Sequence, residues 1–195
     1  MHEKKDNIYC YDSEVLINKF DEKNFDRFKI IETNFTAARI LLFQKEKPPE
    51  IFNLDYLRYI HKYIFQDIYN WAGQIRNIEI SKGQLWFARC EFIENEAYKL
   101  FKKLKEENNL SSYDTDEFCK RIAYYKTEIN MIHPFREGNG RAIREFIIKL
   151  GMYNGYDICF NEVSKEEYLD AMYRSPYDDT KLYNIIKKIT KKVKA

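Results

Sequence analysis

The sequence is poor in residues that break regular structure, and it lacks any long apolar run. It has 4 prolines and 6 glycines in 195 residues, against 16 tyrosines and 14 phenylalanines. This balance favours helices that pack through aromatic side chains over a loop-rich sandwich. No stretch approaches the roughly 18 consecutive apolar residues of a membrane-spanning helix, and the N-terminus MHEKKDNIYC is too polar for a signal peptide. We therefore expect a soluble protein.

An excess of one charge and a cluster of cysteines are also missing. The 33 basic and 31 acidic side chains give a net charge of +2, which supplies no general electrostatic reason to bind nucleic acid or an anionic membrane. Each cysteine stands alone, without the close pairs of a zinc or redox site. We expect buried thiols in a reducing cytoplasm and no strong nucleophile among them. The cysteines are Cys10, Cys90, Cys119 and Cys159.

What the chain does have is helical periodicity in a length that suits one core. We expect one domain over residues 1–195, with a core of about 9–174. Apolar residues recur at helical spacing over about 25–43, 54–68, 92–104 and 118–132, and Asn53 and Asp114 stand where helix caps are expected. His61 falls on an apolar helix face, so a buried, hydrogen-bonded histidine is the favoured interpretation over a catalytic one.

Two shorter segments complete the predicted fold. Alternating residues on either side of Lys82 and Gly83 predict a short β-hairpin, the only strand pair that we expect. Residues 180–194 are rich in lysine, which could indicate nucleic-acid binding, but their apolar residues follow a helical pattern and favour a basic amphipathic docking helix. The fold class predicted is a mostly α-helical bundle with one short hairpin.

The nine residues HPFREGNGR, 133–141, carry the strongest functional signal. Phe135, alone among polar neighbours, is interpreted as an anchor to the core. The next apolar helix begins near Asn139 or Gly140, and a helix start presents unpaired N–H groups and a partial positive charge that suit phosphate. Arg141 and Arg144 share a helix face just beyond, where guanidinium groups match phosphate oxygens.

Two further residues complete a set of chemical groups. Glu137 would repel a phosphate unless a cation lay between them, and Mg²⁺ prefers one or two carboxylates together with phosphate oxygens. His133 has the side chain best suited to take a hydroxyl proton at neutral pH. Taken separately, each residue has an ordinary structural explanation as a turn, a cap or a solvated charge. In this order, between two apolar helices, they predict a polyphosphate site with a general base.

These residues also carry a family resemblance. HPFREGNGRAIR resembles the signature of Fic-domain proteins, His-Pro-Phe-x-Asp/Glu-Gly-Asn-Gly-Arg-x-x-Arg, without departure. IHKYIFQDIYNWAGQIR is similar to the upstream helix of the family, ISKGQLWFA to its hairpin, called the flap, and YCYDSEVLINKF to its N-terminal segment. The resemblance covers residues 9–174, and the loop is its most specific part.

The resemblance implies a Fic fold that transfers AMP from Mg-ATP to a Ser, Thr or Tyr hydroxyl of a target protein. It implies His133 as general base and Glu137 as Mg²⁺ ligand, while the flap aligns an extended segment of the target. The implied nucleotide-binding residues are Phe135 as buried anchor, Gly138, Asn139, Gly140, Arg141 and Arg144, with Tyr168 and Met172 near the adenine. The implied flap residues are Ile80, Ser81, Lys82, Gly83, Leu85 and Phe87.

Finer predictions follow from single positions within that family. The phosphorylating Doc-like branch has lysine where this chain has Gly140, so the AMP-transferring form is favoured. Two alternatives stay open. Relatives with the same loop transfer UMP or phosphocholine, and the chain could also be a non-catalytic module that binds a nucleotide or a partner. No inhibitory Ser/Thr-x-x-x-Glu-Gly/Asn motif occurs in the chain. We therefore expect a separate antitoxin that supplies a glutamate to Arg144, which makes this chain a toxin. We expect it in the cytoplasm, its own or that of another cell.

Overall fold

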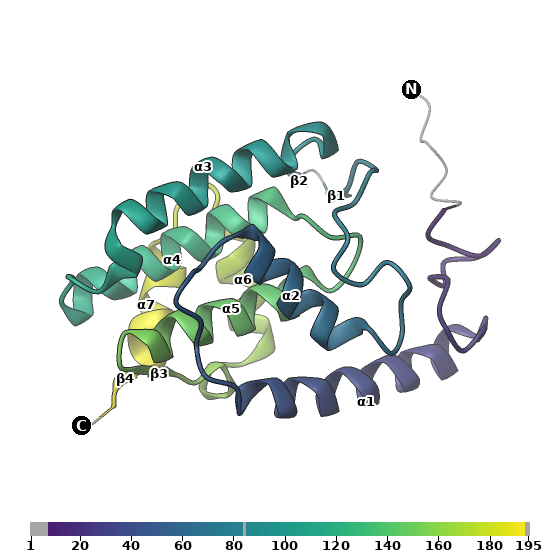
Figure 1. Cartoon of the computed structure of the whole chain (residues 1–195), viewed down its shortest axis with the longest axis horizontal. Helices are drawn as coiled ribbons and strands as arrows, with labels where there is room; N and C mark the ends of the chain where they lie inside the picture. Colours follow the sequence, from purple (N-terminus) through teal and green to yellow (C-terminus); the bar gives the residue numbers. More distant parts are fainter. Residues whose placement is uncertain (1–7, 84, 194–195) are drawn as a thin grey trace.

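The computed structural model describes residues 8–83 and 85–193 and is mostly helical, as the sequence predicts (Figure 1). Short 3₁₀ turns occupy Cys90–Phe92, Asn108–Leu110 and Phe160–Glu162. The α-helices are α1 (Phe25–Gln44), α2 (Leu54–Phe65), α3 (Ile93–Glu106), α4 (Thr115–Ile132), α5 (Asn139–Tyr153), α6 (Lys165–Arg174) and α7 (Thr180–Ile189).

Side-chain caps fix several helix starts where the sequence predicts them. The Asn53 side chain accepts a hydrogen bond from the Tyr56 N–H at the start of α2. The Asp114 side chain likewise accepts from the Glu117 N–H in α4, as predicted. At α6 the Ser164 side chain accepts from the Glu167 N–H. Each cap pairs an N–H group that the helix itself leaves free, so these boundaries are set by local chemistry.

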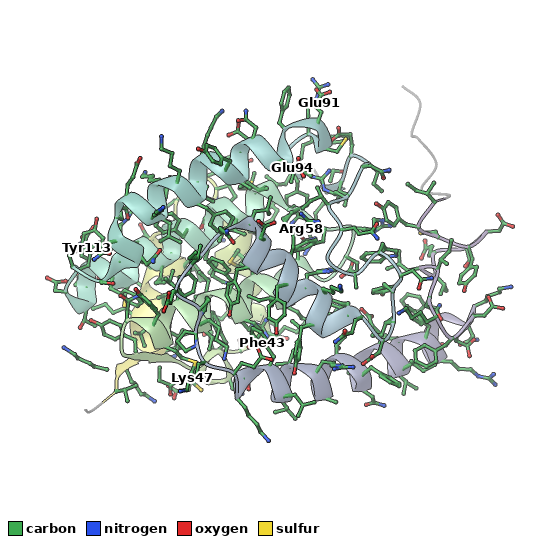
Figure 2. The ribbon with its side chains drawn as sticks, in the orientation of Figure 1. Phe43, Lys47, Arg58, Glu91, Glu94 and Tyr113 are labelled. Atoms are coloured by element: carbon green, nitrogen blue, oxygen red, sulfur yellow. The ribbon has the colours of Figure 1, made fainter. Side chains whose placement is uncertain are left out.

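Helices α2 and α5 lie at the centre of the fold (Figure 1). Helix α5 packs against α2, α4 and β3, while α1 runs along one side of α2 and α7 packs against α4. Phe43, at the end of α1, is fully buried, whereas Glu91 points outward at the edge of the molecule (Figure 2). Within the described part of the chain, one apolar cluster includes residues of every helix from α1 to α7. No helix of residues 8–83 and 85–193 is both long and apolar enough to cross a bilayer.

The predicted hairpin is present but shorter than the alternation suggests. Strands β1 (Ser81–Lys82) and β2 (Leu85–Trp86) pair antiparallel, with Ser81 opposite Trp86 and Lys82 opposite Leu85. The Phe87 N–H donates to the Ile80 carbonyl and extends the pair. Ile78 lies outside the ladder because its carbonyl accepts a hydrogen bond from the Arg76 guanidinium instead.

A second strand pair corrects two predictions at the C-terminal end. Strand β3 (Tyr156–Ile158) pairs antiparallel with β4 (Thr190–Lys192), so the expectation of a single strand pair was wrong. The C-terminal helix, predicted over 180–194, ends at Ile189, because the following backbone pairs with β3 and the Val193 N–H donates to the Gly155 carbonyl. Residue 194 lies outside the described residues.

The cysteines differ from expectation in their burial. Cys119 is buried on α4, whereas the other three are half-buried. All four are free thiols. The prediction of buried thiols therefore holds for one of them, because Cys10, Cys90 and Cys159 lie in connecting segments at the edge of the core rather than on a helix face that points into it.

Candidate active site

The 133–141 loop between α4 and α5 is held from beneath by buried side chains. Helix α4 ends where His133 adopts a left-handed conformation, with φ of +48°. Phe135 is fully buried, as predicted for an anchor. The Asn139 side chain closes the loop, since its Oδ1 accepts from the Phe135 N–H at 2.9 Å and its Nδ2 donates to the Phe135 carbonyl at 2.7 Å. The Asn139 side-chain amide therefore holds the loop in its conformation.

His61 supports the same loop from α2, and the prediction of a buried, hydrogen-bonded histidine is confirmed. Its Nδ1 accepts from the Gly73 N–H at 2.9 Å, so Nε2 carries the proton and donates to the Glu137 carbonyl at 2.9 Å. The imidazole also stacks on Phe135, with ring centroids 3.9 Å apart. Burial lowers the pKa of His61 to about 3, so the ring is neutral at physiological pH.

The two glycines that flank Asn139 meet different surroundings. Gly138 has φ of +79°, and a Cβ there would lie 2.3 Å from the Phe65 ring. Only glycine fits such a position without strain. A Cβ on Gly140 would meet nothing within 4 Å. Helix α5 begins at Asn139 without a side-chain cap. The Arg141 and Ala142 N–H groups donate to the Gly138 carbonyl, so the N–H groups of Asn139 and Gly140 are the ones left without a partner at this helix start among the described residues.

His133 is oriented as a proton acceptor. Its Nδ1 lies 3.1 Å from the Asn130 carbonyl, which can only accept, so Nδ1 carries the proton and Nε2 keeps its lone pair. Phe87 of the flap stacks on the imidazole, with centroids 3.7 Å apart and planes 14° from parallel. Burial lowers the pKa of His133 to about 4, and the positive charges of Arg76 and Lys82 contribute. The imidazole is therefore neutral at pH 7.

A cavity of about 460 Å³ brings most of the predicted site together. It lies between the flap, the first turn of α5, the end of α4 and one face of α6. Phe135 is buried beneath its floor, and Gly83 lies at the flap turn outside it. The predicted residues in its wall are Ile80, Ser81, Lys82, Leu85, Phe87, His133, Glu137, Gly138, Asn139, Gly140, Tyr168 and Met172.

The two arginines predicted to hold phosphates lie elsewhere. Arg141 pairs with Glu32 of α1 at 2.7 Å and contacts Glu137 at 3.7 Å. Arg144 packs over the Phe160 and Tyr168 rings at about 5.5 Å, and its buried Nε has no hydrogen-bond partner among the described residues. Both arginines line a second cavity of about 900 Å³. Their predicted role requires each side chain to turn toward the first cavity.

Three residues that the sequence interpretation passed over take part in the site. Lys126 and Asn130 line the first cavity from α4. They lie seven and three residues before His133, so helical periodicity could have placed all three on one face. Arg76 is fully buried and donates to the carbonyls of His133, Ile78 and Ala88, which ties the base of the flap to the end of α4. An isolated arginine in a loop gives no such signal in a sequence.

The site thus combines a neutral imidazole, an open helix start and a carboxylate around one cavity, a combination suited to chemistry on a phosphate-containing ligand. Residues 51–150 match the Fic/DOC family, and the chain belongs to that family. It is 37% identical over 171 residues to the probable protein adenylyltransferase y4lH of Sinorhizobium fredii, covering 85% of this chain and 86% of that protein.

Two further comparisons extend this result. The chain is 36% identical over 172 residues to the protein adenylyltransferase VbhT of Bartonella schoenbuchensis. The match covers 88% of this chain but 36% of the length of VbhT, so the chain spans about a third of that relative. Its fold matches a crystal structure of BepC from Bartonella tribocorum with bound AMPPNP at a TM-score of 0.90 and 27% identity, over 99% of this chain and 100% of that one.

Proposed function

We propose that this protein transfers AMP from ATP to a hydroxyl group of a target protein. The observation that carries the proposal is the neutral His133, whose Nε2 lone pair lies beside the uncapped start of α5 in one cavity. The names of y4lH and VbhT and the AMPPNP bound to BepC support the same reaction, because AMPPNP shares the adenosine and triphosphate layout of ATP.

In this reaction the target oxygen attacks the α-phosphorus while His133 Nε2 takes its proton. A bond forms between the hydroxyl oxygen and the α-phosphorus, the bond from that phosphorus to the bridging oxygen breaks, and pyrophosphate leaves. The N–H groups at the start of α5 stabilise the negative charge that develops on the attacked phosphate. The open space at Gly140 lets the phosphate approach this backbone closely. Positioning and charge stabilisation supply most of the rate enhancement.

Glu137 fits the role of a Mg²⁺ ligand. Its side chain is about half exposed at the cavity edge. One carboxylate oxygen, Oε1, accepts from the Gly138 N–H and faces Arg141, and the other has no partner among residues 8–83 and 85–193. A free oxygen beside a phosphate site is the donor that Mg²⁺ prefers. When bound, the ion would neutralise phosphate charge.

The flap offers a docking site for the target. It lies across the cavity from Gly138 and contacts His133 through Phe87. We propose that an extended target segment adds to this hairpin by backbone hydrogen bonds, since short exposed strand edges recruit strands in this way. The stacked Phe87 ring would then set the distance between the target hydroxyl and the imidazole.

A second proposal concerns regulation by an antitoxin. Arg144 has a buried, unpartnered Nε, and it lies in the second cavity, whose wall includes apolar residues of α1 and α5 such as Ile40, Leu41 and Ile148. A partner helix with an apolar face and a glutamate would fill this cavity and pair with Arg144. A purified chain should then be active by itself, and a purified chain without activity would contradict this proposal.

We further propose that the protein acts in a cytoplasm, its own or that of another cell. Its free thiols suit a reducing compartment, and BepC is described as a VirB-translocated effector. Disulfide-linked forms of the purified native protein, detected without reducing agent, would argue against a reducing compartment.

The main proposal is tested by labelling. The chain is incubated with a cell lysate and ATP labelled on the α-phosphate or, in parallel, on the γ-phosphate. Label from the α-phosphate alone, absent with His133→Ala, is the expected result, while calorimetry should show that this variant still binds ATP. Label from the γ-phosphate would indicate kinase chemistry. If neither label transfers although ATP binds, the chain is a binding module or transfers another group, and labelled UTP or CDP-choline would identify the latter.

A further inference from the structure

Lys126 is a buried cation in the wall of the proposed nucleotide cavity. It lies on α4 seven residues before His133, and its residue surface is 1% exposed. Its ammonium group lies over the rings of Phe160 at 4.9 Å and Tyr168 at 5.2 Å. These contacts offset part of the cost of burying the charge. The ring faces themselves offer no oxygen or nitrogen acceptor to the three N–H donors of the group, and the one side-chain acceptor beside them in the described part of the chain is the Tyr168 hydroxyl.

A second buried lysine shows what a purely structural role looks like in this fold. Lys149 of α5 is also fully buried. Its Nζ donates to the carbonyls of Gln44 and Glu46, so it caps the end of α1. Lys126 has no ion pair and no backbone carbonyl acceptor among the described residues. Burial lowers its pKa, a hydrogen bond with the Tyr168 hydroxyl offsets part of this shift, and the charge of Arg144 lowers the pKa further; no carboxylate of the described residues acts on the group. The Tyr168 hydroxyl accepts from one of the three N–H donors, and the buried ammonium group calls for a further acceptor from a ligand.

The position of Lys126 indicates which part of a nucleotide would supply that acceptor. Seven residues along a helix correspond to roughly 10 Å, so Lys126 lies well away from His133 and the start of α5, where the proposed function places the phosphates. Tyr168 lies beside Lys126, and the same cavity wall includes Ile143 and Met172, so apolar and aromatic side chains suited to a flat base line this cavity. With the phosphates at one end of the cavity, the base lies at the other.

We propose that Lys126 is a base-recognition residue whose Nζ donates a hydrogen bond to a ring nitrogen of the adenine. This inference rests on the proposed function, because it requires the cavity to bind ATP. Adenine presents N1, N3 and N7 as acceptors, whereas its exocyclic amino group donates and cannot pair with an ammonium group. Replacing the contacted nitrogen by C–H should therefore remove the interaction without changing the shape of the base.

The test measures binding of ATP and of 1-deaza-, 3-deaza- and 7-deaza-ATP to the full chain by titration calorimetry. One of the three analogues should bind the wild type about 10- to 100-fold more weakly than ATP, as for a hydrogen bond to a charged group. Lys126→Met should bind ATP as weakly as the wild type binds that analogue, and should no longer distinguish the two. Lys126→Arg should restore part of the difference.

Lys149→Met is the matched control, because it also removes a buried lysine. It should lower the melting temperature while keeping the discrimination between ATP and the analogue. Equal binding of ATP and all three analogues to the wild type overturns the inference without any variant, and so does a Lys126→Met protein that still discriminates. If the wild type binds no ATP at all, the proposed function itself is wrong. The failure of the Lys126 inference and the failure of the proposed function therefore give different results.

Discussion

The 133–141 loop and the flap, residues 80–87, form facing walls of one cavity but are built in opposite ways. Beneath the loop, three buried groups fix the backbone: the Phe135 ring, the Asn139 amide and the His61 imidazole. The flap has exposed side chains, with Trp86 61% exposed, and a ladder of only two residue pairs. The loop is specified by its packing, whereas the flap is held only at its base.

This difference matches what each wall would have to do. In-line attack on a phosphate requires atoms placed to within a fraction of an ångström, which only a buried, fully hydrogen-bonded loop provides. A hairpin that pairs with the backbone of a target can vary its side chains freely. Variants at the buried positions of the loop should therefore change stability and chemistry together, and variants of exposed flap residues should change neither.

The largest effect is expected at Gly138. In Gly138→Ala the new methyl group would overlap the Phe65 ring at a backbone angle that favours glycine. The combined strain should lower the free energy of unfolding by about 2 to 5 kcal/mol and reduce AMP transfer by more than tenfold. Urea denaturation and α-phosphate labelling measure the two effects. Full activity in a stable Gly138→Ala protein would show that the loop is less tightly specified than its packing indicates.

Gly140→Ala sharpens the comparison within the loop. The added Cβ has open space around it and lies inside a helix, so stability should stay the same or rise by up to about 1 kcal/mol. Affinity for ATP should nevertheless fall, because the methyl group occupies the space through which a phosphate reaches the first turn of α5. Calorimetry and urea denaturation on the same sample separate the two quantities. A stable variant with unchanged affinity would place the phosphates elsewhere.

The next largest effect is expected where the two walls are joined, at Arg76. Arg76→Met leaves three buried carbonyls without a donor, which should cost about 3 kcal/mol of stability. It also frees the end of α4, so kcat should fall about tenfold while the affinity for ATP changes little. Arg76→Lys keeps the charge but loses the guanidinium fork. Its stability and its kcat should lie between those of the wild type and those of Arg76→Met. An unchanged kcat in the folded Met variant would show that the flap base does not position His133.

Much of the loop could be predicted from the sequence, because its determinants are local. The end of α4 before Pro134, the start of α5 at Asn139 and the buried Phe135 all follow from residue types and their spacing. The same holds for His61, whose place on an apolar helix face predicts its burial. Helical periodicity could not predict the hydrogen-bond partner of His61, because the Glu137 carbonyl is 76 residues away in the sequence.

The elements that the sequence did not predict depend on distant contacts. Strand β4 forms because its backbone meets β3, more than thirty residues earlier, and this pairing overrides the helical pattern that continues through Val193. The partner of Arg141 is Glu32, which lies 109 residues earlier in the sequence. Nothing in the local sequence around either residue indicates this ion pair. Spacing along α4 could have predicted that Lys126 lies in the cavity wall. It could not have predicted that Lys126 has no acidic partner among the described residues.

A smaller effect is expected from the Phe87 ring, which joins the flap to His133, the proposed general base. In Phe87→Ala the imidazole of His133 gains solvent, so its pKa should rise from about 4 toward the ordinary value of about 6.5. His133 favours its neutral form in the folded state, so its contribution to stability is complete above pH 6.5 and is lost as the pH falls toward 4. The variant should lose less stability over this range. Transfer by the variant should decline at a higher pH than in the wild type.

Imidazole NMR resonances followed between pH 4 and 8 measure this shift directly. His61 is the internal control, because it is buried against Phe135 and has no contact with Phe87. Its resonances should not move over this range in either protein. If His133 titrates at the same pH with and without the Phe87 ring, burial by the flap is not what keeps the base neutral.

The smallest effect is expected on strand β2 of the flap, where Trp86 projects into solvent. Trp86→Ala removes no buried contact, so the free energy of unfolding should change by less than about 0.5 kcal/mol, and the affinity for ATP should not change. If the target binds through backbone hydrogen bonds, KM for the target protein should rise by only a few fold. A loss of hundredfold or more would mean that this side chain, and not the strand edge, recognises the target, and the flap would then be as specifically built as the loop that it faces.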